Sequence, residues 1–309
     1  MKKRRTRNAK RAENTVPQWL SFTTTACAFG ALLWLERRRP LRRNVESKLT
    51  RDARNLAVAS AGAIVTSLAE RPAALWAARR VEKRREGLLL KLNLPAWLET
   101  LLAVLLLDYT LYLWHYLVHR VPFLWRFHLV HHVDLDMDAT TSLRFHFAEL
   151  LISVPFRLLQ VRVIGVSPRA FTAWQTFLLP SVLFHHSNVR LPIKVERALC
   201  RCIVTPRMHG IHHSIVKKET NSNWSSGLTV WDYLHGTLRL NVPQNEITIG
   251  VPAYREPREV TLEKILEMPF KRQRPTWKLR GNAYDLEGQI ENLGDERNAP
   301  LAYRVKAEN

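Results

Sequence analysis

The chain has 309 residues and a formal net charge of +20, and its length allows one large domain or two small ones. A positive charge of this size is often a sign of nucleic-acid binding. Here the basic residues flank apolar runs, as Lys and Arg do beside anionic lipid headgroups, so we predict no nucleic-acid partner. Three cysteines, an odd number, do not indicate a disulfide framework.

The N-terminal part of the chain alternates basic and apolar segments. Residues 1–16 form a basic arm that we expect to be disordered, and no cleavable signal peptide is apparent. Val166-Ser167-Pro168 is a helix-ending turn between the last two apolar runs, which we expect to form either a tight hairpin within the membrane or a re-entrant pair. Apolar runs, several of them near the length of a membrane-spanning helix, cover residues 17–35, 55–78, 94–118, 147–166 and 167–184.

The run 94–118 is the strongest candidate span. It contains Glu99, Asp108 and His115, which are costly in hydrocarbon and so are expected to face a protein interior. The histidines begin at its C-terminal end, which predicts a site at or just outside one membrane face. The positive-inside rule places the basic loop 36–54 in the cytosol and the histidines with it, although the basic segment 79–91 would then lie on the opposite side.

All twelve histidines fall between positions 115 and 235. They form one H-x3-H motif beginning at His115 and two H-x2-H-H motifs beginning at His128 and His209. On a helix, residues three or four apart share a face, so each motif directs several imidazoles into one small volume. Neutral imidazole suits iron, zinc, copper and nickel. At least nine clustered histidines are too many for one ion, so the pattern predicts a polynuclear metal site.

The arrangement of these motifs resembles the fatty acid hydroxylase / sterol desaturase superfamily of membrane di-iron enzymes. Its members use two metal ions and molecular oxygen to hydroxylate or desaturate lipid chains or sterols. The resemblance implies the same cofactor pair, two non-haem iron ions, for this chain. The matching stretches are residues 108–120, 122–132, 140–149, 184–192, 205–214 and 221–237.

The resemblance also implies the metal ligands, residue by residue. His185 lies beside the histidine of the H-S-N stretch, and His235 stands where the family has an aromatic residue, so we interpret His235 as a packing or surface residue. The implied ligands are His115, His119, His128, His131, His132, His146, His186, His209, His212 and His213.

Other polar residues have weaker interpretations. Four are candidates to orient ligand imidazoles by accepting their second N–H, with polar capping as the alternative. Alternating aspartates after the second motif lack the glycine and glutamate of a calcium loop, so we interpret them as a solvated loop. The four candidates to orient imidazoles are Asp108, Asn188, Asn223 and Asp232, and the alternating aspartates are Asp134, Asp136 and Asp138.

The predicted fold is all-α: an integral, multi-pass membrane helical bundle with a histidine-rich cytosolic cap that holds a dinuclear metal site. After the arm 1–16 come membrane segments at 17–92, a catalytic domain at 93–240 and a polar extension at 241–309, whose apolar patch 262–270 docks on the cytosolic face. The predicted function is oxygen-dependent hydroxylation or desaturation of a membrane lipid. Electrons come from an external donor (a reductase, ferredoxin or cytochrome), because no haem, flavin or ferredoxin motif is visible. The alternatives are a non-catalytic membrane metal-binding protein and a zinc-dependent membrane hydrolase.

Overall fold

The computed structural model describes residues 18–278, and within them the chain is helical with no β-strand. Three isolated bridges, such as that between Pro40 and Val189, tie loops together. The all-α prediction is confirmed for these residues. The predicted disordered arm 1–16 and the end of the C-terminal extension lie outside them.

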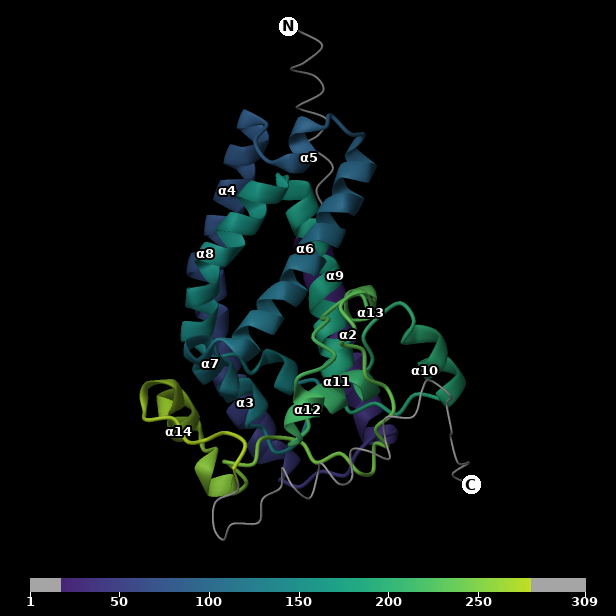
Figure 1. Cartoon of the computed structure of the whole chain (residues 1–309), viewed down its shortest axis with the longest axis vertical. Helices are drawn as coiled ribbons and strands as arrows, with labels where there is room; N and C mark the ends of the chain where they lie inside the picture. Colours follow the sequence, from purple (N-terminus) through teal and green to yellow (C-terminus); the bar gives the residue numbers. More distant parts are fainter. Residues whose placement is uncertain (1–17, 279–309) are drawn as a thin grey trace, which may run out of the picture.

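Long helices stand side by side along the vertical axis of the molecule, and α2 and α3 extend into its lower half (Figure 1). Ser167 caps the helix after the hairpin turn, since its hydroxyl accepts a hydrogen bond from the Ala170 N–H, and Pro168 occupies its first turn. The predicted helix-ending turn between the two apolar segments is therefore confirmed. The long helices are α2 (Gln18–Arg38), α3 (Lys48–Val65), α4 (Arg71–Arg84), α6 (Ala96–Arg120), α8 (Phe147–Ile164) and α9 (Pro168–His186), and the short helix α5 (Leu88–Lys91) lies between α4 and α6 in the chain.

The second apolar run forms one long helical rod instead of stopping at Pro72. A π-helical turn, η1 (Thr66–Glu70), joins α3 directly to α4. A proline inside a helix clashes with the carbonyl four residues earlier, here that of Leu68, and the wider π turn contains that residue. The rod packs along α8 and brings the basic start of α3 to the histidine end of the bundle.

One helix of the described residues, α6, is long and apolar enough to cross a membrane, with 25 residues and a mean hydropathy of 1.6. The strongest predicted span is thus one continuous helix, and its passage through a membrane stays a prediction. Large apolar side chains are also exposed on the neighbouring upright helices. They include Trp19, Phe22, Leu56, Ile64, Leu68, Trp76, Leu151, Leu159 and Val163.

Short helices and loops gather at the lower end of the bundle (Figure 1). The predicted apolar patch 262–270 packs there, with Ile265 and Met268 against Val58 and Leu129. The short helices are α7 (Pro122–His132), α10 (Ile193–Leu199), α11 (Pro206–His212), α12 (Lys217–Thr220), α13 (Val230–Leu234) and α14 (Leu262–Glu267). Single 3-10 turns are η2 (Thr141–Leu143), η3 (Pro257–Glu259) and η4 (Met268–Phe270).

The three alternating aspartates after α7 are buried, so the prediction of a solvated loop is wrong. Asp134 is completely inaccessible and accepts hydrogen bonds from Arg51 and Asn55 of α3. Burial by itself raises the pKa of Asp134, but the guanidinium groups of Arg51, Arg144 and Arg54 lower it to about 2. The sequence does not reveal the pairing with Arg51 and Arg54 because these two residues lie some 80 residues earlier in the chain.

Candidate metal centre

Nine of the ten predicted ligands come together at the lower end of the bundle, in two neighbouring groups. Within each group the candidate ligand atoms all lie within 4.8 Å of one another. The five-histidine group contains His115, His119, His128, His132 and His212. The four-histidine group contains His131, His186, His209 and His213.

Four helices deliver these side chains because their histidine-bearing ends meet at one place. His115 and His119 stand one turn apart at the C-terminal end of α6, and His186 is the last residue of α9. The short helices α7 and α11 pack across this junction and carry the two H-x2-H-H motifs. The two groups also touch, since the parallel rings of His132 and His213 have centroids 4.3 Å apart.

The four-histidine group presents its Nε2 atoms to one another. The Nε2 of His186 lies 3.0 Å from that of His131 and 3.0 Å from that of His209, which lies 3.2 Å from that of His213. Two nitrogens each ~2.1 Å from one ion are about 3.0 Å apart when they subtend a right angle. The spacing therefore fits four imidazoles turned toward a shared cation.

The five-histidine group leaves buried ring nitrogens without a partner. They include Nε2 of His119, His128 and His212 and both ring nitrogens of His132. Buried polar atoms are seldom left unpaired, and a cation bound among them would satisfy all of these at once. Burial, followed by the nearby imidazoles, lowers the pKa of His132 and His213 well below the ordinary value. Their rings are neutral at pH 7, which is the form that binds a metal.

Backbone carbonyls fix the orientation of several rings. His115 Nδ1 donates to the Trp224 carbonyl at 2.7 Å, and His212 Nδ1 donates to the Ser222 carbonyl at 2.8 Å. His186 Nδ1 likewise donates to the carbonyl one turn earlier in α9, at 2.9 Å. A proton held on Nδ1 leaves Nε2 with its lone pair directed into the group.

One orienting carboxylate escaped the sequence analysis. His128 Nδ1 donates to Glu149 Oε1 at 2.8 Å, and Glu149 is itself buried in the first turn of α8. A carboxylate behind a ligand histidine fixes its tautomer and increases its basicity. Glu149 ends the R-F-H-F-A-E stretch, three residues after His146, and its place in this matching stretch is the signal that could have identified it.

His146 lies outside both groups, so the geometry contradicts its prediction as a tenth ligand. Its Nδ1 accepts a hydrogen bond from the Ala148 N–H and thereby caps α8. Its Nε2 lies 3.1 Å from the Leu266 carbonyl. Both ring nitrogens are engaged, and the residue joins α8 to the C-terminal extension.

The other two uncertain histidines differ in their surroundings. His185 is buried, with its ring centroid 4.1 Å from that of His209, but it belongs to neither group. His235 is exposed at the surface and stacks on Tyr109 and Tyr112. The structure thus places His235 as a packing residue, as the sequence predicted.

The four polar residues predicted to accept directly from imidazoles do not do so, and that prediction is wrong for the described structure. Asp232 accepts instead from the backbone N–H groups of Trp224 and Ser225. Because the Trp224 carbonyl accepts the hydrogen bond from His115, Asp232 is linked to this ring through one intervening residue.

Asn223 has a similar indirect position. Its Nδ2 donates to the Met208 carbonyl at 2.9 Å, and its backbone has a positive φ of 52°, a conformation that asparagine tolerates better than most residues. This turn sets the direction of the preceding Ser222 carbonyl, which holds His212.

Asp108 and Asn188 hold loops in place. Asp108 accepts from the Leu228 N–H and from Trp231 Nε1, which ties α6 to the segment around α13. The Asn188 side chain accepts from the Arg42 N–H and donates to the Arg42 carbonyl. Both residues are polar anchors between segments that are distant in sequence.

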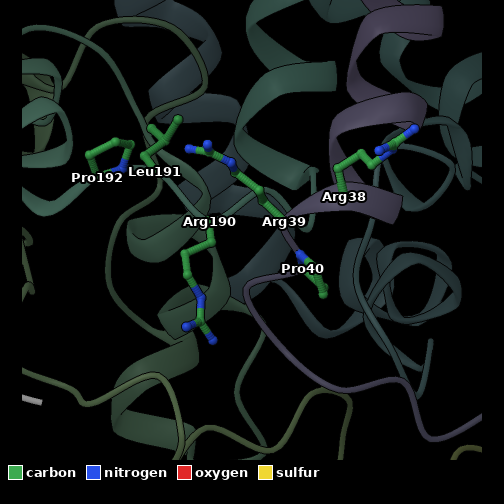
Figure 2. A pocket seen from close by; sticks show the side chains of 6 residues that line it. All are labelled: Arg38, Arg39, Pro40, Arg190, Leu191 and Pro192. Carbon is green, nitrogen blue, oxygen red and sulfur yellow. The ribbon is translucent and has the colours of Figure 1, made fainter. Parts of the chain in front are cut away.

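Two hollows lie near this end of the molecule. The larger, of about 490 Å³, is lined by Arg38, Arg39 and Arg190 with neighbouring apolar residues and contains none of the predicted ligands (Figure 2). The smaller, of about 250 Å³, is lined by His119, Arg120, Trp125 and Lys217 among others. Of these two, the smaller is therefore the one that reaches the histidine groups.

Comparison with known proteins agrees with this geometry. Residues 100–237 match the family model described as fatty acid hydroxylase, and this range contains both histidine groups. This part of the chain is similar to the fatty acid hydroxylase family, and the match confirms the resemblance drawn from its motifs.

Curated relatives from bacteria and vertebrates match the same part of the chain. An ornithine lipid hydroxylase of Rhizobium tropici is 31% identical over 159 residues, 51% of this chain and 46% of the relative. Cholesterol 25-hydroxylase of Mus musculus is 31% identical over 142 residues, 45% of this chain and 46% of the relative. Alkylglycerol monooxygenase of Xenopus tropicalis is 29% identical over 150 residues, 48% of this chain and 31% of the relative. The chain thus spans less than half the length of each of these relatives, and no solved structure matches it significantly.

Proposed function

We propose that this protein is a multi-pass membrane oxidoreductase that uses molecular oxygen and two iron ions to hydroxylate a lipid. The observation that supports this most strongly is the pair of adjacent buried histidine groups at one end of the helical bundle. The relatives named above are a lipid hydroxylase, a sterol hydroxylase and an alkylglycerol monooxygenase, and for this reason we favour hydroxylation over desaturation.

In this proposal each histidine group holds one ion. When bound, the pair of ions supplies the redox chemistry that activates oxygen toward an unactivated C–H bond. The protein's own contribution is to keep the imidazoles neutral, to fix their tautomers and to exclude water. Burial keeps the imidazoles neutral. The carbonyls that accept from His115 and His212 and the carboxylate of Glu149 fix the tautomers. The close packing of α7 and α11 over the helix ends excludes water.

The balanced reaction sets a requirement for a partner. Inserting one oxygen atom of O2 into a C–H bond leaves the second atom to form water, which consumes two electrons and two protons. No haem-attachment, flavin or ferredoxin motif is visible in the sequence, so we propose that an external reductase, ferredoxin or cytochrome supplies the electrons.

The membrane arrangement is part of the proposal. Apolar side chains such as Phe22 on α2, Trp76 on α4 and Leu159 on α8 are exposed around the bundle beside α6, as expected for surfaces in contact with lipid. The loop between α2 and α3 and the histidine groups lie at the same end of the bundle. Since that loop is basic, we place this end in the cytosol.

The test is to purify the full chain in detergent and to measure its metal content, followed by lipid mass spectrometry of cells with and without the gene. We expect two iron ions per chain and a lipid product that is one oxygen atom heavier. Ester cleavage without oxygen consumption, or zinc as the metal that supports turnover, would instead indicate a hydrolase. Stable iron binding with no oxygen-dependent lipid change in any extract would indicate a non-catalytic metal-binding protein.

A further inference from the structure

The smaller hollow is the opening of the metal centre. Of the nine grouped histidines, eight are buried and His119 alone is partly exposed. His119 is also the histidine that lines this cavity, which has a volume of about 250 Å³. A molecule that enters the cavity therefore meets the five-histidine group first.

The walls of the cavity are aromatic on one side. The rings of Trp125 and Trp277 stack with centroids 6.1 Å apart, and the Trp125 ring centroid lies 4.8 Å from that of His119. Trp125 is held in place because its Nε1 donates to Thr276 Oγ1. These flat apolar faces suit hydrocarbon, whereas a site that admits only water or oxygen does not require them.

The rim of the cavity is cationic. Arg120 and Lys217 line it from α6 and α12, and both are exposed. Within residues 18–278 no carboxylate pairs with Arg120, whose guanidinium lies over the rings of Tyr116 and Trp224 at 5.2 and 5.5 Å. A guanidinium held against aromatic faces and free of a carboxylate partner is suited to bind a phosphate or a carboxylate.

The cavity also lies where a membrane lipid could reach it. It is at the C-terminal end of α6, the helix long and apolar enough to cross a membrane, and the neighbouring Leu117, Val121 and Phe123 are exposed. An amphiphile in the adjacent leaflet would thus find an apolar approach beside a cationic rim.

On this basis we propose that the cavity binds the anionic headgroup end of the lipid substrate. Arg120 and Lys217 pair with its phosphate or carboxylate, while Trp125 and Trp277 flank the first carbons of its chain. The inference rests on the proposed function and makes it more specific. Ligand pockets for drug-sized molecules have volumes of about 300–1,000 Å³, so this cavity holds only one end of a lipid. Because neighbouring residues His119 and Arg120 both line it, the oxidised carbon lies within a few bonds of the headgroup.

The experiment is photo-crosslinking, which does not depend on turnover. The full chain is reconstituted in phosphatidylcholine vesicles that contain phosphatidic acid with a diazirine near the glycerol end of one acyl chain. The matched probe is phosphatidylcholine with the same diazirine. We expect the phosphatidic acid probe to label the peptides that contain Trp125 and Trp277 about tenfold more than its neutral counterpart, as for loss of one charged hydrogen bond.

Variants locate the binding to the rim. Arg120→Gln combined with Lys217→Gln should lower labelling by the anionic probe about tenfold, and Arg120→Lys should retain most of it because the charge remains. Arg201→Gln and Lys218→Gln make the same charge changes at exposed residues that do not line the cavity, and we expect each to change labelling by less than about twofold.

Two results would overturn the proposal. One is equal labelling by the two probes, or labelling that the double variant leaves unchanged. The other is complete competition by inorganic phosphate at the concentration of the probe, which would show an anion site that does not recognise lipid. Iron content is measured on every sample: a failure of headgroup binding with two iron ions retained refutes this inference alone, whereas absence of iron from the unmodified chain refutes the proposed function.

Discussion

The two histidine groups are built from the same short motif, used in opposite ways. In α7 the outer pair of H-x2-H-H, His128 and His132, joins the five-histidine group while His131 joins the other. In α11 the outer pair, His209 and His213, joins the four-histidine group while His212 joins the other. Each short helix therefore bridges both proposed ions.

The groups also differ in access. The four-histidine group is entirely buried, whereas the five-histidine group has the partly exposed His119 and the cavity beside it. In the four-histidine group the rings mainly contact one another. In the five-histidine group, rings are oriented by hydrogen bonds to a backbone carbonyl and to the carboxylate of Glu149. We infer that the five-histidine group faces the substrate and that the other serves as an enclosed partner.

The most severe test of this comparison replaces one ligand in each group. His132→Ala and His213→Ala should each lower the iron content from two ions to one or none and reduce turnover by at least about 1,000-fold, because a group missing one imidazole leaves the ion without its geometry. Iron analysis of the purified variants with an oxygen-uptake assay measures both. Retention of two ions in His213→Ala would remove the four-histidine group from the metal centre.

A large effect on stability is expected where the aspartate loop meets α3, since this contact supports the end of α7 that serves both groups. Arg51 forms buried ion pairs with Asp134 and Asp138, and leaving such carboxylates unpaired costs about 3–5 kcal/mol. Arg51→Met should therefore lower the thermal midpoint of the purified protein markedly in detergent. Arg201→Gln, at an exposed position, is the control and should leave the midpoint within error.

The same contact predicts a dependence on pH. Burial raises the pKa of Asp138, but the charges of Arg51 and Lys48 outweigh it and lower the pKa below the ordinary value of 3.8. A carboxyl with a lowered pKa stabilises the fold above pH about 4 and loses that contribution as the pH falls toward its folded pKa. Asp138→Asn should flatten the decline in thermal midpoint below pH about 4 relative to the unmodified chain. An unchanged acid profile would mean that the pair does not contribute.

A smaller effect, limited to one group, is expected from the carboxylate behind His128. Glu149→Gln keeps the shape of the side chain but weakens the bond to His128 Nδ1, and changes of this kind typically cost 10–100-fold in metal affinity or activity. Titration with iron should show one weakened site and one unaffected site. Glu263→Gln, at an exposed position, should bind both ions normally, and equal weakening of both sites in Glu149→Gln would contradict the division into two groups.

The smallest effect is predicted for His146. Because this ring caps α8 and lies outside both groups, His146→Ala should lower the stability by about 1 kcal/mol and leave two iron ions bound. Thermal unfolding and metal analysis on the same sample distinguish these effects. Loss of one ion would restore His146 to the ligand set.

The sequence by itself determined the local features of this protein. Apolar runs predicted α6 and the α8–α9 hairpin, since helix length, the turn at Ser167 and Pro168 and the cost of buried polar groups are all local properties. Histidine spacing predicted that imidazoles would converge, because residues three and four apart share a helix face. Nine of the ten implied ligands are accordingly found in the two groups.

Only the tertiary structure decided how those histidines are divided and what surrounds them. The spacing H-x2-H-H is identical in α7 and α11, so the assignment of His131 and His212 to opposite groups depends on how the helices pack. Glu149 and the buried aspartates acquire their roles from partners 21 to about 90 residues away. Such contacts depend on how helices far apart in the sequence pack together, and a pattern that repeats every few residues carries no information about them.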